Sequence, residues 1–180
     1  MKKTFTFWFT GLSGSGKTTI ANSVKPRLEK SGYSVFVIDG DEVRKRHHSH
    51  LSFTQEDIKE NNFLIAKMCI ENKGKYDVIL VPIISPYNIS RQKARDVLNP
   101  YFYEIYFSAP LSCVIARDVK GLYTKARRNE IDRLIGYSPS NVYEPPQYPD
   151  FIVNSDRDSI DKSSEEFYQF VISKIGGSNS

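Results

Sequence analysis

The most informative stretch of this 180-residue chain is Gly11-Leu12-Ser13-Gly14-Ser15-Gly16-Lys17-Thr18-Thr19. It matches the pattern G-x-x-x-x-G-K-[ST], follows an apolar and aromatic run from Phe5 to Phe9, and precedes a segment that can continue as a helix. The apolar run is typical of a buried strand, so the pattern stands between a strand and a helix, as a Walker A phosphate loop requires. The sequence therefore predicts a nucleoside triphosphate site.

The composition of this loop accounts for its expected chemistry. Glycines let the backbone wind closely enough for successive N–H groups to point at phosphate oxygens, and the helix N-terminus behind adds partial positive charge. Lys17 is expected to reach the β- and γ-phosphates and Thr18 to ligate the metal, so ATP and Mg²⁺ are the expected cofactors. The residues predicted from the loop to bind the cofactor are Gly11, Ser13, Gly14, Ser15, Gly16, Lys17, Thr18 and Thr19.

Size and composition limit the classes of function. The length suits a single domain, expected over residues 1–175 with a flexible tail at 176–180, so one domain must hold both substrates. The chain has no run of about 18 apolar residues and enters its first strand directly after Met1-Lys2-Lys3-Thr4, which favours a cytoplasmic protein without a membrane span or secretion signal. The net charge of +4 is dispersed, so we expect anionic small substrates and no nucleic-acid partner.

Strand and helix signals alternate along the chain without an internal repeat. Strands are expected at 5–9, 34–38, 77–81, 101–107 and 151–153, and helices at 17–30, 42–46, 55–73, 90–98, 110–117 and 159–175. Pro26 is a position where the first helix can kink or shorten. The alternation predicts an α/β fold: a three-layer P-loop NTPase sandwich whose five-stranded, mainly parallel sheet has helices on both faces.

Two acids follow the second expected strand. Asp39 and Asp41 stand where a parallel strand gives way to a loop, and ligands of open α/β sheets bind at that edge. The structural alternative is a turn and an N-cap for the next short helix. We expect at least one of the two carboxylates to serve the chemistry at the phosphate loop.

A basic segment follows the helix expected at 110–117. The stretch between Arg117 and Arg133 carries further cations against three acids and has little apolar periodicity; the cations are Lys120, Lys125, Arg127 and Arg128. In a phosphotransferase such a segment is typical of a lid, here about 119–137, that closes over the triphosphate and neutralises charge on the transferring phosphoryl group. An ordinary solvated helix is the alternative.

The histidines and cysteines receive no catalytic role. The 47–50 stretch holds three histidines, but no Cys or carboxylate stands at ligand spacing, so anion binding or a solvated surface is favoured over zinc. Cys69 and Cys113 lie in apolar surroundings without a spacing suited to metal or redox chemistry. Both are expected to be reduced residues of the core.

Several groups of residues together resemble the adenylyl-sulfate (APS) kinase family. They are the phosphate loop, Asp39-Gly40-Asp41 with Val43-Arg44, Phe53 with Glu60-Asn61, Ile84-Ser85-Pro86-Tyr87, and Arg117-Asp118-Val119-Lys120-Gly121-Leu122-Tyr123 with Lys125-Ala126-Arg127. The resemblance covers nearly the whole chain, through Tyr143-Glu144-Pro145-Pro146. The block from Asp118 to Tyr123 is the specific part, because phosphate loops occur in many families.

The resemblance implies transfer of the γ-phosphoryl group of MgATP to the ribose 3′-hydroxyl of adenylyl sulfate, by a P-loop kinase with a lid that is commonly a homodimer. It implies that Asp41 orients and deprotonates the hydroxyl, with Lys17 and Lys120 as the other catalytic residues, and that Arg117 contacts the cofactor. An aromatic face can stack on a base, and cations can pair with phosphates. The implied substrate-binding residues are Asp39, Asp41, Arg44, Phe53, Asn61, Ile84, Ser85, Lys120 and Leu134.

The chain also departs from the family pattern on the acceptor side. Ile58 stands where the family has an arginine for the phosphosulfate group. Asn88 stands where an arginine is usual, and Glu42 where an asparagine is usual. The loop at 45–52 also differs from the family pattern. An isoleucine has no donor for an anion, so either Arg46 or a histidine of the 47–50 stretch takes over, or the acceptor differs. Two alternatives follow: the same chemistry on a related acceptor such as cytidine diphosphoramidate, from surface-polysaccharide pathways, or a nucleotide-binding regulatory protein without catalysis.

Overall fold

The computed structural model describes residues 2–47 and 50–177 and contains one five-stranded sheet. Neighbouring strands pair in parallel in the order β2-β3-β1-β4-β5, so the predicted α/β sheet is confirmed. The strands are β1 (Phe5–Thr10), β2 (Val35–Val37), β3 (Val78–Val81), β4 (Phe102–Ser108) and β5 (Phe151–Asn154). The helices are α1 (Lys17–Lys30), α2 (Gly40–Arg46), α3 (Gln55–Glu71), α4 (Asn88–Leu98), α5 (Leu111–Arg117), α6 (Leu122–Arg127) and α7 (Ile160–Gly176).

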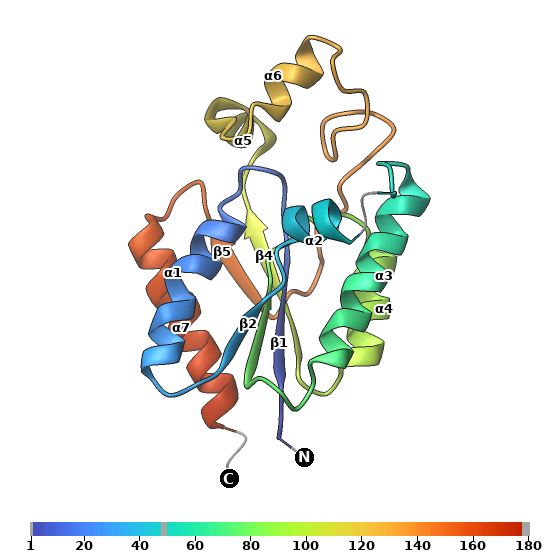
Figure 1. Ribbon diagram of the computed structural model, residues 1–180. Helices are drawn as coiled ribbons and strands as arrows, with labels where there is room; N and C mark the ends of the chain where they lie inside the picture. Colours follow the sequence, from blue (N-terminus) through green and yellow to red (C-terminus); the bar gives the residue numbers. More distant parts are fainter. Residues whose placement is uncertain (1, 48–49, 178–180) are drawn as a thin grey trace.

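The sheet is covered on both faces, which gives the predicted three layers (Figure 1). Helices α1 and α7 pack on one face, and α3 and α4 on the other. Side chains alternate along β1, so Phe7 and Phe9 enter the core beneath α7 while Trp8 enters the core beneath α3 and α4. All six residues of β1 are buried, because a central parallel strand has covering elements on both sides.

The carboxyl ends of the parallel strands meet at one edge of the sheet. The phosphate loop follows β1, α2 follows β2, and the segment 82–87 follows β3 at this edge. Helices α5 and α6 and the long loop after them form a separate layer above it, at the top of Figure 1. The topology thus brings segments from most of the chain length to one place.

Several local expectations need correction. Helix α1 runs through Pro26 without interruption, since Val24 and Leu28 on either side of the proline are buried against the core. Helix α2 begins two residues earlier than expected, at Gly40, because the Asp39 side chain caps it. Part of the 119–137 segment is helical, as α6. Gly176 ends α7, and residues 178–180 of the expected tail lie outside the described residues.

The two cysteines differ from each other in burial. Cys69 is buried, which raises the pKa of its thiol, whereas Cys113 is only partly buried. Both are free thiols, so the prediction of reduced residues is confirmed and the prediction that both lie in the core is wrong for Cys113. Within residues 2–47 and 50–177, no helix combines the length and apolarity needed to cross a bilayer.

Candidate functional site

A large cavity lies at the carboxyl edge of the sheet. Its volume is about 1070 Å³, above the range of roughly 300–1,000 Å³ typical of a pocket for one small ligand, so two nucleotide-sized molecules can share it. Most of the site residues predicted from the sequence line it; Gly11 and Asp39 are not among the lining residues. The predicted residues that line it are Ser13, Gly14, Ser15, Gly16, Lys17, Thr18, Thr19, Asp41, Arg44, Phe53, Asn61, Ile84, Ser85, Arg117, Lys120 and Leu134.

The phosphate loop is wound tightly against the end of the sheet. A Cβ atom on Gly11 would lie 2.8 Å from the Phe107 carbonyl oxygen, so no side chain fits there. Gly16, which precedes α1, has a φ of 89°, a left-handed conformation that glycine adopts without strain. Glycine at these two positions therefore sets the path of the loop, and its residues Ser13 to Thr19 face the cavity.

Lys17 is buried within this loop. Its ammonium group donates to Gly11 O at 2.8 Å, Leu12 O at 2.7 Å and Ser15 Oγ at 3.2 Å. Burial, followed by repulsion from Lys120, lowers the pKa of Lys17 to about 7, although the nearby aspartates oppose this shift. An anion placed at the loop would stabilise the charged ammonium.

Asp39 bridges the loop and α2. Its Oδ2 accepts from Thr18 Oγ1 at 3.0 Å, while its Oδ1 accepts from the backbone N–H groups of Asp41 and Glu42 at 2.9 and 3.3 Å. The N-cap alternative is therefore correct for Asp39. The adjacent hydroxyl and carboxylate oxygens are the hard ligands that Mg²⁺ prefers, and a magnesium ion that keeps several waters and phosphate ligands needs no more protein groups than these.

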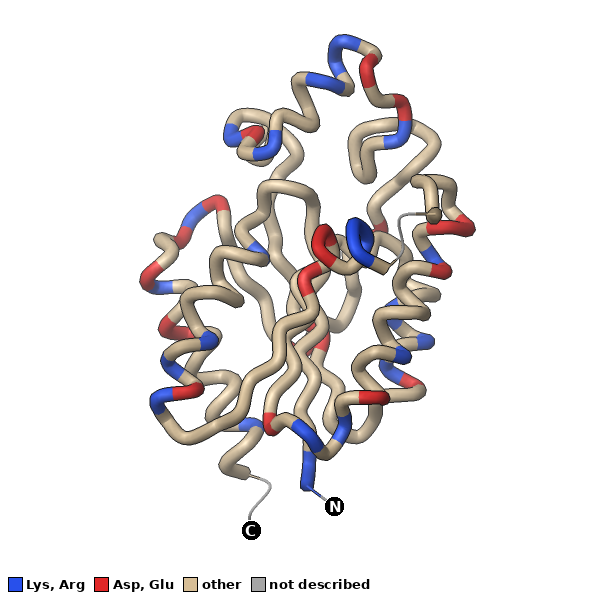
Figure 2. Tube along the Cα trace, viewed as in Figure 1, with Lys and Arg blue, Asp and Glu red and all other residues tan. Residues whose placement is uncertain are grey.

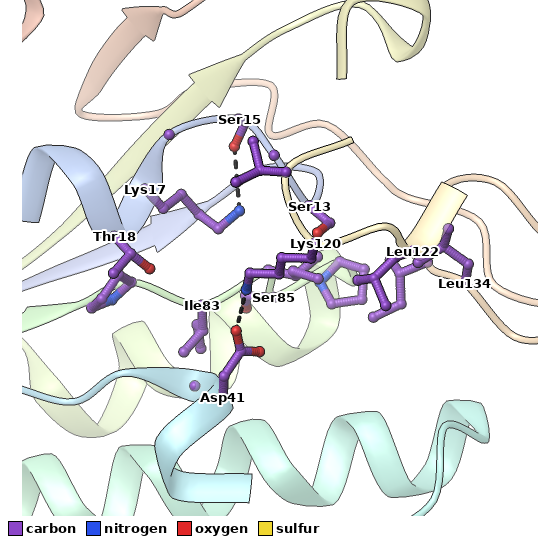
Figure 3. Close-up of a pocket in the computed structure, with 18 of the residues that line it drawn as sticks. Ser13, Ser15, Lys17, Thr18, Asp41, Ile83, Ser85, Lys120, Leu122 and Leu134 are labelled. Carbon is purple, nitrogen blue, oxygen red and sulfur yellow. Dashed lines mark hydrogen bonds and ion pairs between the residues drawn. The ribbon is translucent and has the colours of Figure 1, made fainter. Parts of the chain in front are cut away.

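Asp41 projects from the first turn of α2 toward the 119–137 segment. Its carboxylate forms an ion pair with Lys120 Nζ, which connects that segment to α2. Figure 3 shows Lys17, Thr18 and Asp41 around the same space, with Lys120 reaching Asp41. The tertiary structure thus brings together residues that the sequence separates by 79 positions.

Ser85 forms a strained wall of the cavity. It has a φ of 44° although it is not glycine, and its side chain and carbonyl are held by neighbours. Trp8 Nε1 donates to its Oγ at 3.0 Å, and Thr10 Oγ1 and Arg91 Nη1 donate to its carbonyl at 3.0 and 2.6 Å. Sequence reasoning missed Arg91, whose only signal is a charged residue on the inner face of an amphipathic helix.

Arg44 and Phe53 lie against each other, and both line the cavity. The Arg44 guanidinium is 4.5 Å from the Phe53 ring centroid and donates to Leu51 O and Ser52 O at 3.1 and 2.8 Å. Half of the Phe53 side chain is exposed. The separate roles expected for them, phosphate pairing and base stacking, stay predictions.

Ile58 belongs to an apolar cluster that lines part of the cavity. It is buried with Tyr87 and Ile135, so an anion would meet no donor from this side chain. The residues predicted to replace the missing arginine do not line the cavity. Arg46 forms an ion pair with Glu42, with 3.8 Å between Nη2 and Oε1, and neither Arg46 nor His47 or His50 is a lining residue. His48 lies outside the described residues.

Other lining groups were not singled out from the sequence. Arg133 lines the cavity, and its charge was visible only as one of several in the basic segment. Asn62 is buried beside Asn61 in α3 and donates to Ile58 O at 2.7 Å. The two polar residues that interrupt the apolar pattern of α3 are therefore amides at the cavity wall. Among the described residues, no group of three or more His, Cys, Asp or Glu side chains is arranged to hold a metal.

The 119–137 segment packs on the phosphate loop, and its role as a lid stays a prediction. Leu12 of the loop lies in a cluster with Tyr123 and Leu134, and Tyr123 OH donates to Ser13 O at 3.0 Å. Basic and acidic residues occur along the whole segment (Figure 2), and four of them, Lys120, Glu130, Asp132 and Arg133, line the cavity. Arg117, at the end of α5, donates to Ser155 O.

Comparisons with known proteins agree with this arrangement. The family model described as adenylylsulphate kinase matches residues 3–154. An adenylyl-sulfate kinase of Halothermothrix orenii is 44% identical over 177 residues, which cover 96% of this chain and 92% of that protein, and one of Clostridium kluyveri is 37% identical over 93% of this chain and 83% of that protein. The solved APS kinase of Mycobacterium tuberculosis in complex with AMPPNP and APS superposes with a TM-score of 0.86 and 35% identity, covering 95% of this chain and 99% of that one.

Proposed function

This chain belongs to the adenylyl-sulfate kinase family, and on that premise we propose that it transfers the γ-phosphoryl group of ATP to the ribose 3′-hydroxyl of a nucleotide, with adenylyl sulfate as the first acceptor to test. The observation that carries the proposal is the shared cavity: the phosphate-loop lysine Lys17 and the carboxylate of Asp41 line one space large enough for two nucleotides.

ATP is assigned to the phosphate-loop half. The loop N–H groups and Lys17 would hold the β- and γ-phosphates, since the N–H groups carry partial positive charge and the ammonium a full one. Thr18 and Asp39 would hold Mg²⁺, which when bound with ATP spreads the negative charge of the phosphates. The exposed pair of Lys120 and Asp41 can open, and Lys120 can then contact the transferring phosphoryl group.

The acceptor is assigned to the half of the cavity lined by Phe53, Asn61 and Ile84. In this placement Asp41 accepts the proton of the 3′-hydroxyl and holds the oxygen in line with the γ-phosphorus. The 119–137 segment acts as a lid that excludes water, because it packs on the loop and contacts Asp41 through Lys120. The roles of the predicted site residues are part of this proposal.

A second acceptor class is favoured by one observation. Ile58 and Ile135 make part of the cavity wall apolar, and neither Arg46 nor the described histidines line it. Because Ile58 offers no donor to a terminal sulfate, we propose to test beside adenylyl sulfate a related acceptor with a different terminal group, such as cytidine diphosphoramidate, which carries an NH2 group in place of one terminal oxygen.

Steady-state ADP release with each acceptor tests the proposal. We expect MgATP and adenylyl sulfate to give turnover above the background of ATP hydrolysis, with phosphate on the 3′-oxygen of the product. Faster turnover of cytidine diphosphoramidate than of adenylyl sulfate would make the cytidine compound the proposed acceptor. Absence of turnover over a panel of nucleotides would contradict the kinase proposal and favour a regulatory nucleotide-binding protein.

Nucleotide binding is expected to take up protons near pH 8. Because the pKa of Lys17 is lowered to about 7, most of this amine is neutral at pH 8, and a bound triphosphate would recharge it. Calorimetric titration of MgATP in two buffers of different ionisation enthalpy should therefore report uptake approaching one proton at pH 8. The proton uptake should fall as pH is lowered through 7 to 6, where Lys17 is already charged. Equal uptake at pH 8 and pH 6 would contradict the lowered pKa of Lys17.

Self-association and location complete the proposal. One solved relative is described as a hexameric APS kinase from Thiobacillus denitrificans, whereas we propose a homodimer for this chain, to be measured by sedimentation. A kinase that consumes ATP works where ATP is made, so we propose a cytoplasmic location.

A further inference from the structure

Asn141 lies in the loop between α6 and β5 and is buried, with 1% of its surface exposed. Its side-chain amide connects three separate segments. Nδ2 donates to Phe53 O and Arg133 O, both at 2.9 Å, and Oδ1 accepts from Tyr87 OH at 3.1 Å. Its own carbonyl oxygen accepts from Gly136 N at 2.7 Å. Both amide protons and the amide oxygen are thus used.

The partners of Asn141 form the walls of the acceptor half of the cavity. Phe53 and Arg133 line it directly, from the loop before α3 and from the 119–137 segment. Tyr87 packs with Ile58 and Ile135, which also line it. Asn141 itself does not line the cavity, and its side-chain bonds lead to the acceptor walls and not to the phosphate loop.

The chemistry of the position suits a neutral amide. Two part-buried carbonyl groups converge on it, and each is satisfied by a donor because a carbonyl withdrawn from water and left unpaired is costly. A carboxylate has no donor for them and a hydrophobic side chain has none either. In Figure 1 the loop that carries Asn141 descends beside the N-terminal end of α3, where Gln55 Nε2 also donates to Ser140 O at 3.1 Å.

We propose that Asn141 is a positioning residue that clamps the Phe53 wall to the Arg133 wall and so sets the affinity of the site for its acceptor nucleotide. The inference rests on the proposed function, since it assigns the acceptor to that half of the cavity. Without the bonds of Asn141 the two walls separate in the free protein. Part of the free energy of acceptor binding then goes into bringing them together, so the affinity for the acceptor falls. The phosphate-loop half keeps its own bonds and its affinity for ATP.

The kinetic test uses Asn141→Ala and Asn141→Asp, the latter keeping an acceptor for Tyr87 OH while removing both donors. For both variants we expect the KM of the acceptor to rise roughly tenfold, in line with two lost hydrogen bonds, and the KM of ATP to stay within about twofold. Tyr87→Phe, which removes one bond and keeps the two carbonyl bonds, should have a smaller effect. The matched control is Asn72→Ala, whose amide donates to Met68 O at 2.8 Å, outside the cavity.

A second measurement separates the clamp from the proposed function. Hydrogen exchange of the protein without nucleotides should be faster in Asn141→Ala over residues 50–56 and 131–136, and unchanged in the phosphate loop. If the wild-type chain turns over no acceptor, the proposed function fails and this exchange result alone decides whether the clamp exists. Unchanged exchange in both segments, or equal rises in the KM values of ATP and acceptor, would overturn the inference.

Discussion

Asp41→Asn is expected to lower kcat by about 10²- to 10⁴-fold, the usual contribution of a positioned general base, while ATP affinity changes little. Asparagine has nearly the same shape as aspartate but cannot accept the proton of a hydroxyl. Asp41 does not hold α2 in place, because the cap of that helix is made by Asp39. The loss should therefore appear in the chemical step and not in the fold.

The measurement is kcat with saturating acceptor, together with calorimetric affinity for MgATP. Glu42→Gln provides the matched control, since Glu42 is the next residue of α2, pairs with Arg46 at 3.8 Å and does not line the cavity. This control should retain wild-type turnover. An Asp41→Asn protein with full activity would remove Asp41 from the mechanism and leave the deprotonation without an assigned base.

Lys17→Met is expected to lower kcat/KM by about 10²- to 10³-fold, the typical cost of removing one preorganised donor to developing charge. Methionine keeps the apolar stem in the buried site but brings no charge to the phosphates. ATP affinity should fall as well, because Lys17 is expected to contact the triphosphate in the ground state. Lys25→Met, on the same helix but exposed and paired with Glu29 at 3.8 Å, should change neither quantity.

The same variant has a distinct effect on the pH dependence of stability. The pKa of Lys17 is about 7 in the folded chain against its ordinary value of 10.5, so between these pH values the unfolded chain binds more protons at this residue. The contribution of Lys17 therefore makes the free energy of unfolding rise as pH increases from 7 to about 10.5. Urea unfolding over this range should show that slope in Lys25→Met and lose it in Lys17→Met; equal slopes would contradict the assignment of the lowered pKa.

The order of strands and helices could be predicted because its signals are local. Each strand is a short apolar run and each long helix has a cap or a stop in the neighbouring residues, as with Thr54, which accepts from Asp57 N at the start of α3. The first helix has its predicted bounds, and the possible kink at Pro26 is absent, since a proline kink depends on whether packing on both sides holds the helix. The early start of α2 depended on the side-chain direction of Asp39.

The phosphate loop could be read directly from the chain, because its glycines, lysine and threonine act within nine consecutive residues and their geometry follows from local backbone preferences. The acceptor half could not, because its walls come from distant segments that are held together by long-range bonds, such as the one from Asn141 to Phe53 across 88 residues of sequence. Whether a distant amide, arginine or isoleucine faces a cavity depends on how helices and loops pack over the sheet edge. Local propensity carries no information about such contacts, so the Ile58 cluster and the bonds of Asn141 emerged only when the chain was folded.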